Sequence, residues 1–107
     1  MKQHRYFIYI LSNQYNNVLY TGVTNDLPRR IMEHSTGQGG QFTNKYKVYK
    51  LVYYEEGHDI NLAIAREKVI KGGSRERKID LINNLNPQWD DLFEKFSSEP
   101  IDLQVAV

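Results

Sequence analysis

Side chains that could do chemistry together lie close in sequence between residues 19 and 34. Tyr20 is followed by Arg30 and His34, which are four residues apart. Side chains at that spacing project from the same side of a helix. A phenol, a guanidinium and an imidazole can together bind an anion and move a proton. The alternative is that Tyr20 is a packing residue and that Arg29 and Arg30 belong to a solvated helix face.

A second tyrosine is expected beside Tyr20. Aromatic and β-branched residues predict strands over Tyr6–Leu11 and Val18–Thr24, joined by an asparagine-rich turn. A symmetric turn places Tyr9 directly opposite Tyr20, so the two phenols share a sheet face. The alternative is a cross-strand aromatic pair that only stabilises the sheet.

Glu67 falls on an apolar side of a helix expected over residues 59–71. A carboxylate among apolar side chains is costly unless it is paired, protonated or bound to a metal. An ion pair with Lys71, four residues later, is the alternative explanation. A second apolar stripe on this helix predicts that it is buried on two sides; it consists of Leu62, Ala65 and Val69.

The remaining elements follow from capping residues and from glycine and proline breaks. They are a helix capped by Asn25 or Asp26 and running through His34, a flexible loop over residues 35–47, a strand over Val48–Tyr54, a helix beginning at Ser74, and a short helix or turn over Trp89–Phe96. The predicted fold is α/β of the α+β kind, a small three-stranded sheet flanked by helices in the order β-β-α-β-α-α. We expect one domain over residues 1–96 and a flexible tail over 97–107.

Composition narrows the class of protein without naming a substrate. The chain has 107 residues, 25% of them charged, a net charge of +1 and no cysteine. Without cysteine nothing requires an oxidising compartment, and the apolar run near the N-terminus is too short to span a bilayer. We therefore expect a cytoplasmic protein without a membrane partner. Basic residues are concentrated between Arg66 and Lys78, which fits either a basic face or a solvated helix.

These residues together resemble the GIY-YIG nuclease family. The resemblance rests on Phe7-Ile8-Tyr9 and Tyr20-Thr21-Gly22, followed by Arg30, His34 and the helical Glu67. The spacing of the two tyrosines and the arginine is one that this family uses, and the chain is similar to its short stand-alone bacterial subgroup. Phe7 stands where the motif has its first glycine and Thr21 where it has isoleucine, but neither position carries the chemistry. The asparagine that many members have beyond the glutamate has three candidates here, Asn83, Asn84 and Asn86.

The resemblance implies a three-stranded antiparallel sheet between helices and metal-dependent cleavage of a nucleic-acid phosphodiester. It implies that Arg30 holds the phosphate oxygens and that Glu67 is the ligand of a single Mg²⁺ or Mn²⁺. Tyr9 and Tyr20 would bracket the attacking water, one of them as the proton acceptor. His34 would assist proton transfer or phosphate binding.

Further nucleic-acid contacts are expected from basic and aromatic residues, namely Arg29, Lys45, Tyr46, Lys47 and Lys71. DNA is favoured over RNA as the substrate. Selectivity for structure is expected in place of sequence specificity, because no helix carries a cluster suited to reading base edges. One alternative is a nucleic-acid-binding module with little turnover that acts with a partner protein. Another is a protein-interaction domain, which would use Trp89, Phe93 and Phe96 as an apolar patch and could form a homodimer.

Overall fold

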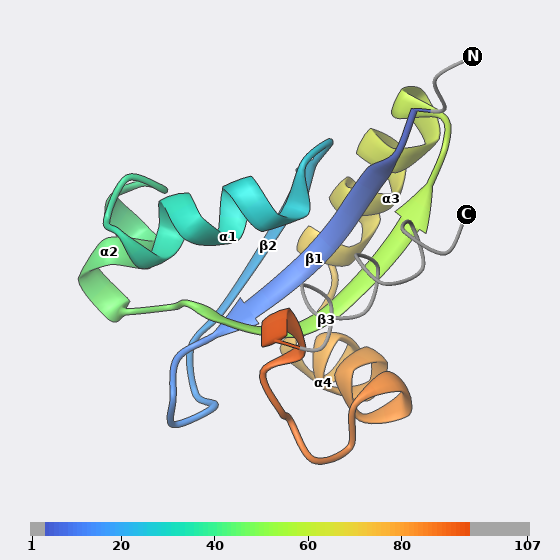
Figure 1. Cartoon of the computed structure of the whole chain (residues 1–107). Coiled ribbons are helices and arrows are strands. Elements are labelled where there is room, and N and C mark those ends of the chain that lie inside the picture. Colours follow the sequence, from blue (N-terminus) through green and yellow to red (C-terminus); the bar gives the residue numbers. More distant parts are fainter. Residues whose placement is uncertain (1–3, 95–107) are drawn as a thin grey trace, which may run out of the picture.

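The computed structural model describes residues 4–94 and consists of one antiparallel sheet between two pairs of helices (Figure 1). The strands are β1 (Tyr6–Ser12), β2 (Leu19–Thr24) and β3 (Lys50–Gly57), and β1 lies in the centre of the order β2-β1-β3. The three-stranded antiparallel sheet is the one expected, although β3 begins and ends later than predicted.

The hairpin register differs from the expected one by two residues. Tyr9 pairs with Gly22 and Leu11 pairs with Tyr20, so Tyr9 and Tyr20 are diagonal neighbours and not direct partners. The cause lies in the turn, where the Asn13 side chain accepts hydrogen bonds from two later backbone N–H groups and so extends β1 to Ser12. A shift of two residues preserves the sheet face. The two tyrosine rings therefore still lie side by side, with centroids 6.3 Å apart.

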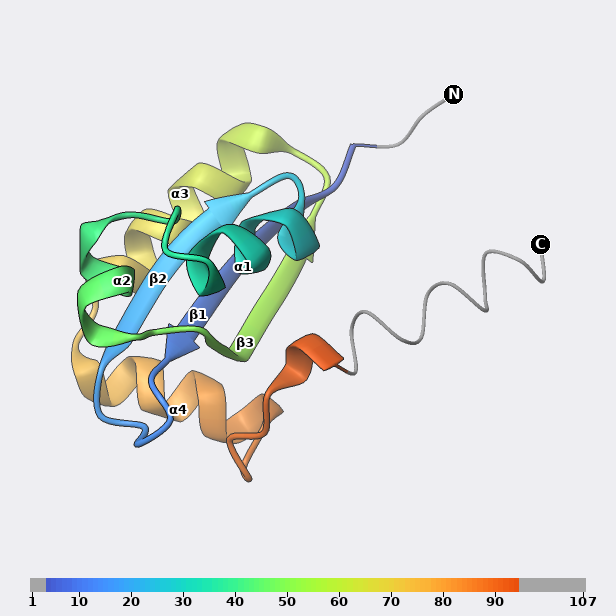
Figure 2. The same cartoon turned by 60° about the vertical axis from the view of Figure 1, so that its left-hand side comes forward.

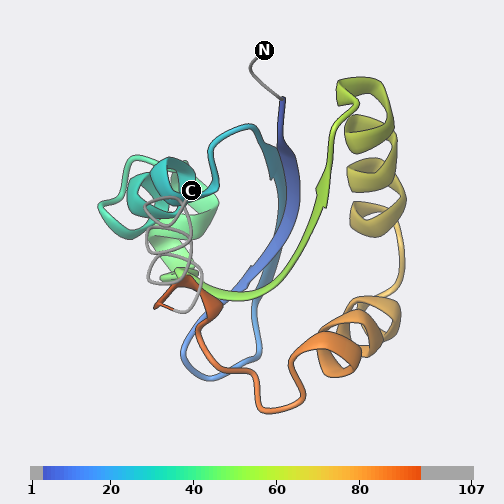
Figure 3. The same cartoon turned by 45° about the vertical axis from the view of Figure 1, so that its right-hand side comes forward.

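Helices cover both faces of the sheet (Figures 2 and 3). Helices α1 (Leu27–Ser35) and α2 (Gln41–Tyr46) lie on one face, and α3 (Ile60–Lys71) and α4 (Arg75–Leu85) lie on the other. The predicted order is confirmed with one addition, because α2 occupies part of the segment expected to be a flexible loop. The predicted caps are also present: the side chains of Asp26, Asp59 and Ser74 each accept a backbone N–H bond.

Two hydrophobic cores form because side chains alternate along the central strand. Phe7, Tyr9 and Leu11 face α1, whereas Ile8 and Ile10 face α3 and α4. All five are almost fully buried. The catalytic candidate Tyr9 is thus also a core residue, which fixes its position.

The expectation that α3 is buried on two sides is wrong. Only Ala63 and Ile70 of this helix belong to the core, while Leu62 is 71% and Val69 63% exposed. The helix forms an outer layer, so only its inner face meets the sheet (Figure 3). The apolar pattern alone could not distinguish a covered face from an uncovered one.

The aromatic residues after α4 pack inward. Trp89 lies against the α3–α4 core and donates to Asn83, and Phe93 lies against the α1 core. This packing argues against the apolar interaction patch; its third member, Phe96, lies outside the described residues, as do the predicted domain boundary and the tail. Asn86 is 5% exposed and bonds to the backbone of β3, which gives it a structural role.

No helix within residues 4–94 combines the length and the apolar character needed to cross a membrane.

Candidate active site

Tyr9 forms the buried centre of the site. Its side chain is 1% exposed, and burial is the main reason why its pKa is raised to about 12. Arg30 opposes this shift, whereas Tyr20 and Glu67 add to it. The ring fits because its cross-strand partner is Gly22: a Cβ there would lie 2.5 Å from the Tyr9 hydroxyl oxygen. The glycine of the YTG stretch is therefore needed to make room for the phenol.

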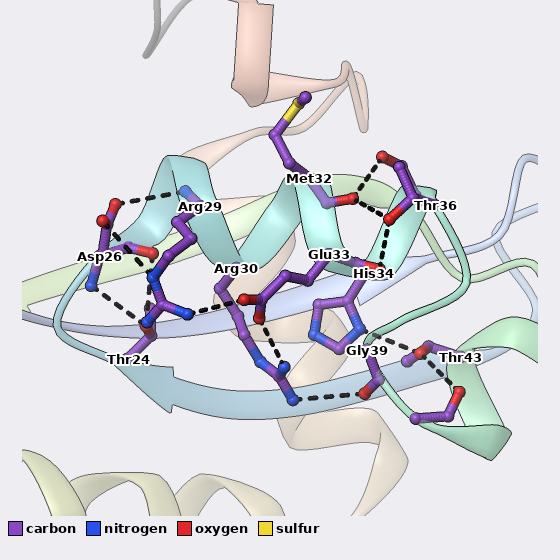
Figure 4. Close-up of polar contacts among 12 residues, drawn as sticks. Thr24, Asp26, Arg29, Arg30, Met32, Glu33, His34, Thr36, Gly39 and Thr43 are labelled. Atoms are coloured by element: carbon purple, nitrogen blue, oxygen red, sulfur yellow. Dashed lines mark hydrogen bonds and ion pairs between the residues drawn. The ribbon is translucent and has the colours of Figure 1, made fainter.

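His34 connects Tyr9 to α2. The imidazole is fully buried, with Nε2 3.0 Å from the Tyr9 hydroxyl and Nδ1 3.0 Å from Thr43 Oγ1. Burial, reinforced by the charge of Arg30, lowers the pKa of His34 to about 4. The ring is therefore neutral near pH 7. Figure 4 shows it between α1 and the chain that leads into α2.

Tyr20 lies between this buried pair and the surface. Its ring is 5.2 Å from that of His34 and 6.2 Å from that of Phe42, measured between centroids. Phe42 in turn lies 4.9 Å from Tyr46, and both of these α2 residues are more than 40% exposed. A row of aromatic side chains thus leads from the site to solvent.

Arg30 lies beside both phenols. Its Nη1 donates to Glu33 over 2.9 Å and its Nη2 donates to the Gly39 carbonyl over 3.3 Å, as Figure 4 shows. Glu33 is the main reason why the pKa of Arg30 is raised, and Tyr9 and Tyr20 add to the effect. In return Arg30 is the main cause of the lowered pKa of Glu33. A guanidinium has five N–H donors, so these two bonds leave others available.

Glu67 comes from α3, on the other face of the sheet. Its side chain is only 12% exposed, and its carboxylate is 3.9 Å from Lys71 Nζ, which makes the expected ion pair a loose one. The charge of Glu67 nevertheless acts on Tyr9, whose pKa it raises. A carboxylate so enclosed and so loosely paired retains oxygen lone pairs for a ligand.

A metal ion would have few protein ligands here. Within residues 4–94, no group of three or more His, Cys, Asp or Glu side chains could hold one. A single carboxylate does fit a hard ion such as Mg²⁺, which keeps several waters and takes further oxygens from a bound phosphate. The donor set around Glu67 is thus compatible with Mg²⁺ or Mn²⁺ and unsuited to an ion that needs a closed protein cage.

The residues expected to contact nucleic acid fall into three places. Lys45, Tyr46 and Lys47 line one hollow of about 500 Å³ beside the β1–β2 turn. Lys71 lines another, of about 300 Å³, together with Tyr20 and Lys78. Arg29 is instead engaged on the surface of α1, where it donates to Glu33 over 2.7 Å.

Sequence reasoning missed four residues of this region: Glu33, Gly39, Phe42 and Thr43. Three of them belong to the segment expected to be a loop or to α2, where no apolar periodicity signals a helix. Gly39 lies so close to His34 that an added Cβ would overlap the imidazole at Nδ1. The run of glycines was the available signal, since a glycine can mark a close approach of the backbone as well as flexibility.

Comparison with known proteins shows the family to which the chain belongs. The family model described as the GIY-YIG catalytic domain matches residues 5–80. The chain belongs to the GIY-YIG family. This family is a nuclease family, and its catalytic domain implies a nucleic-acid substrate.

Relatives cover most of this GIY-YIG chain. A UPF0213 protein of Staphylococcus saprophyticus is 37% identical over 79 residues, which are 74% of this chain and 95% of that protein. One from Clostridium perfringens is 38% identical over 78 residues, 73% of this chain and 83% of that protein. The solution NMR structure of a UPF0213 protein from Bacillus halodurans is 28% identical, covers 81% of this chain and 92% of its own, and has a TM-score of 0.52.

Proposed function

We propose that this protein is a metal-dependent endonuclease that hydrolyses phosphodiester bonds in DNA and selects its substrate by structure. The observation that carries the proposal is the contact between the buried Tyr9 hydroxyl and a neutral His34, beside a guanidinium that also reaches Tyr20. A proton-handling pair next to a cation can supply two contributions to the hydrolysis of an anionic ester, proton transfer and stabilisation of negative charge.

Arg30 is the phosphate ligand of this proposal. Its free donors can bind phosphate oxygens and stabilise the charge that builds up on them in the transition state. Glu33 keeps the guanidinium oriented in the absence of substrate. Because Arg30 is held by two bonds and lies beside both phenols, a phosphate bound to it would adjoin the hydroxyl groups.

Tyr9 and His34 handle the proton. Of the two roles expected for His34, proton transfer is favoured over phosphate binding, because its ring is fully buried and neutral. Tyr9 can take a proton from the attacking water as its own hydroxyl proton moves to His34. Tyr20, which is more exposed, is assigned the orientation of that water. Because its pKa is raised to about 12, Tyr9 is almost entirely the neutral phenol near pH 7, which accepts a proton poorly unless it gives up its own, so the contact with His34 is essential to the step.

Glu67 is the proposed ligand for Mg²⁺ or Mn²⁺. Such an ion supplies polarisation of the phosphate and stabilisation of the leaving oxygen. Its side chain is only 12% exposed, and its ion pair with Lys71 is a loose one of 3.9 Å.

The surfaces around the site fit a flexible nucleic-acid strand. Phe42 and Tyr46 offer exposed aromatic faces next to Tyr20, and stacking on aromatic side chains is tolerant of sequence. Lys45 lies over the Tyr46 ring and Lys71 lines the hollow beside Tyr20 and Phe42, so both add positive charge near these faces. This arrangement favours substrates that expose bases near the cut, such as flaps, branches or single strands.

The test is a cleavage assay on single-stranded, flapped, branched and duplex DNA with Mg²⁺ or Mn²⁺. We expect Tyr9→Phe, Arg30→Ala and Glu67→Gln each to lower the rate, with Arg30→Ala costing about 10²–10³-fold. Arg5→Ala is the matched control, because Arg5 also forms an ion pair with a glutamate but lies away from the site.

Two results would end this proposal. Equal cleavage by the wild type and all variants would mean that a contaminant cuts the DNA. DNA binding that needs Arg30 and falls with salt, without any cleavage, would support the binding module that acts with a partner protein.

A further inference from the structure

We propose that Thr43 is a positioning residue that fixes the proton of His34 on Nδ1, so that Nε2 faces Tyr9 as a proton acceptor. The catalytic meaning of this inference rests on the proposed function, but the assignment of the proton does not. It follows from the donors and acceptors of four groups in series, of which Tyr9, His34 and Thr43 are buried.

Tyr9 is the first group of this series. Its hydroxyl has one hydrogen to donate, and the side chain is 1% exposed, so that hydrogen needs a protein acceptor. Arg30, which also adjoins the hydroxyl, can only donate. His34 Nε2, 3.0 Å away, is an acceptor if it carries no proton. The Tyr9 hydroxyl therefore donates to Nε2.

A neutral imidazole carries its proton on one nitrogen only. With Nε2 unprotonated, Nδ1–H must donate, and Thr43 Oγ1 lies 3.0 Å from it. The Thr43 hydroxyl then has its own hydrogen free, and the Gly40 carbonyl oxygen accepts it over 3.4 Å. Each donor in the series from Tyr9 to Gly40 thus has an acceptor. The reverse assignment would leave the Tyr9 hydroxyl hydrogen without one.

Local backbone structure serves this contact. Thr43 lies in the first turn of α2, nine residues after His34 in the sequence, and is 1% exposed. The backbone between the two residues passes close to the imidazole of His34. Gly39 allows that passage, since any Cβ there would overlap the imidazole. The short helix α2 therefore has a specific task, which is to present the Thr43 hydroxyl to Nδ1.

NMR spectroscopy can show directly which ring nitrogen of His34 carries the proton. Long-range ¹H–¹⁵N correlation spectra of ¹⁵N-labelled protein near pH 7 distinguish the protonated from the unprotonated ring nitrogen of His34. We expect Nδ1–H in the wild type and in Thr43→Ser, which keeps the hydroxyl. In Thr43→Val, which is similar in shape but cannot accept, each tautomer leaves one buried donor without an acceptor, either Nδ1–H or the Tyr9 hydroxyl. The preference for Nδ1 is then lost, and we expect the proton to move at least partly to Nε2.

Activity provides a second readout. Under the proposed function, Thr43→Val lowers kcat by about 10–100-fold, part of the effect of a general base, while Thr43→Ser restores most of it. An Nε2–H signal in the wild type would overturn the inference, and so would an unchanged Nδ1–H in Thr43→Val. If the protein cleaved no nucleic acid, the proposed function would fail while the spectra still decided where the proton lies.

Discussion

Acidification should destabilise this protein because of one histidine. His34 is neutral in the folded protein down to about pH 4, since burial lowers its pKa from the ordinary value of 6.5. In the unfolded chain the same group takes up a proton below pH 6.5. Between these two values the unfolded state binds more protons, so the free energy of unfolding must fall as the pH falls.

The size of the effect follows from the two pKa values of His34, folded and unfolded. A difference of one pH unit between them corresponds to about 1.36 kcal/mol, so over the whole interval the loss approaches roughly 3 kcal/mol. At pH 5 the same linkage relation gives a loss of about 2 kcal/mol relative to pH 7. For a domain of this size that is a large share of a total stability of roughly 5–15 kcal/mol.

Carboxylates contribute in the same direction but at lower pH. Glu33, Glu55 and Glu56 have pKa values held below the ordinary 4.5 by their arginine partners, so their stabilisation is lost as the pH falls below that value. The interval from pH 7 to pH 5 therefore isolates the histidine.

Urea unfolding at pH 5, 6 and 7 measures the effect, followed by circular dichroism and fitted with a common m-value. We expect the wild type to lose about 2 kcal/mol across this interval and His34→Gln to lose much less, whatever its stability at pH 7. His58→Gln, which removes an exposed histidine, should retain the wild-type slope. Equal slopes for wild type and His34→Gln would refute the reasoning, because the buried imidazole would then not be held neutral.

Two further predictions concern Gly22 and the metal. Gly22→Ala should lower the free energy of unfolding by about 1–3 kcal/mol, because its Cβ would overlap the neighbouring buried phenol, whereas Gly57→Ala has nothing within 4 Å and should change little in the same denaturation experiment. Chelation of divalent ions with EDTA should stop DNA cleavage and added Mg²⁺ or Mn²⁺ should restore it, and a titration should show that Glu67→Gln needs far more metal; cleavage that survives chelation would contradict the metal requirement.

Much of the fold could be predicted because its signals are local. Strand composition and caps such as Asp26 and Asp59 depend on residues a few positions apart, and the structure has both in place. The hairpin register could not be derived from turn length, because Asn13 organises the turn through its side chain. The shift of two residues was harmless to the site, since only an odd shift would have moved Tyr9 to the other face.

The parts that escaped prediction depend on contacts between distant segments. Whether Leu62 and Val69 are covered depends on what packs outside α3, which its apolar pattern does not reveal. Helix α2 has six residues, of which Thr43 is buried, so its sequence shows no apolar periodicity that would predict a helix. Thr43 acquires its importance only when α2 folds back over α1 to reach His34.

Two glycines explain why these distant segments can meet in one site. Gly22 of β2 leaves the space that the Tyr9 hydroxyl fills, and Gly39 leaves the space that His34 fills. In both places an added methyl group would displace a side chain of the proposed proton pathway, the Tyr9 phenol in one case and the His34 imidazole in the other. Gly57 at the end of β3 and Gly40 before α2 have no such role, since an added Cβ would meet nothing within 4 Å there. At Gly22 and Gly39, by contrast, the glycine marks where another side chain comes within van der Waals contact of the backbone. In this chain, Gly22 makes room for Tyr9 and Gly39 makes room for His34, and these two side chains form a hydrogen bond with each other.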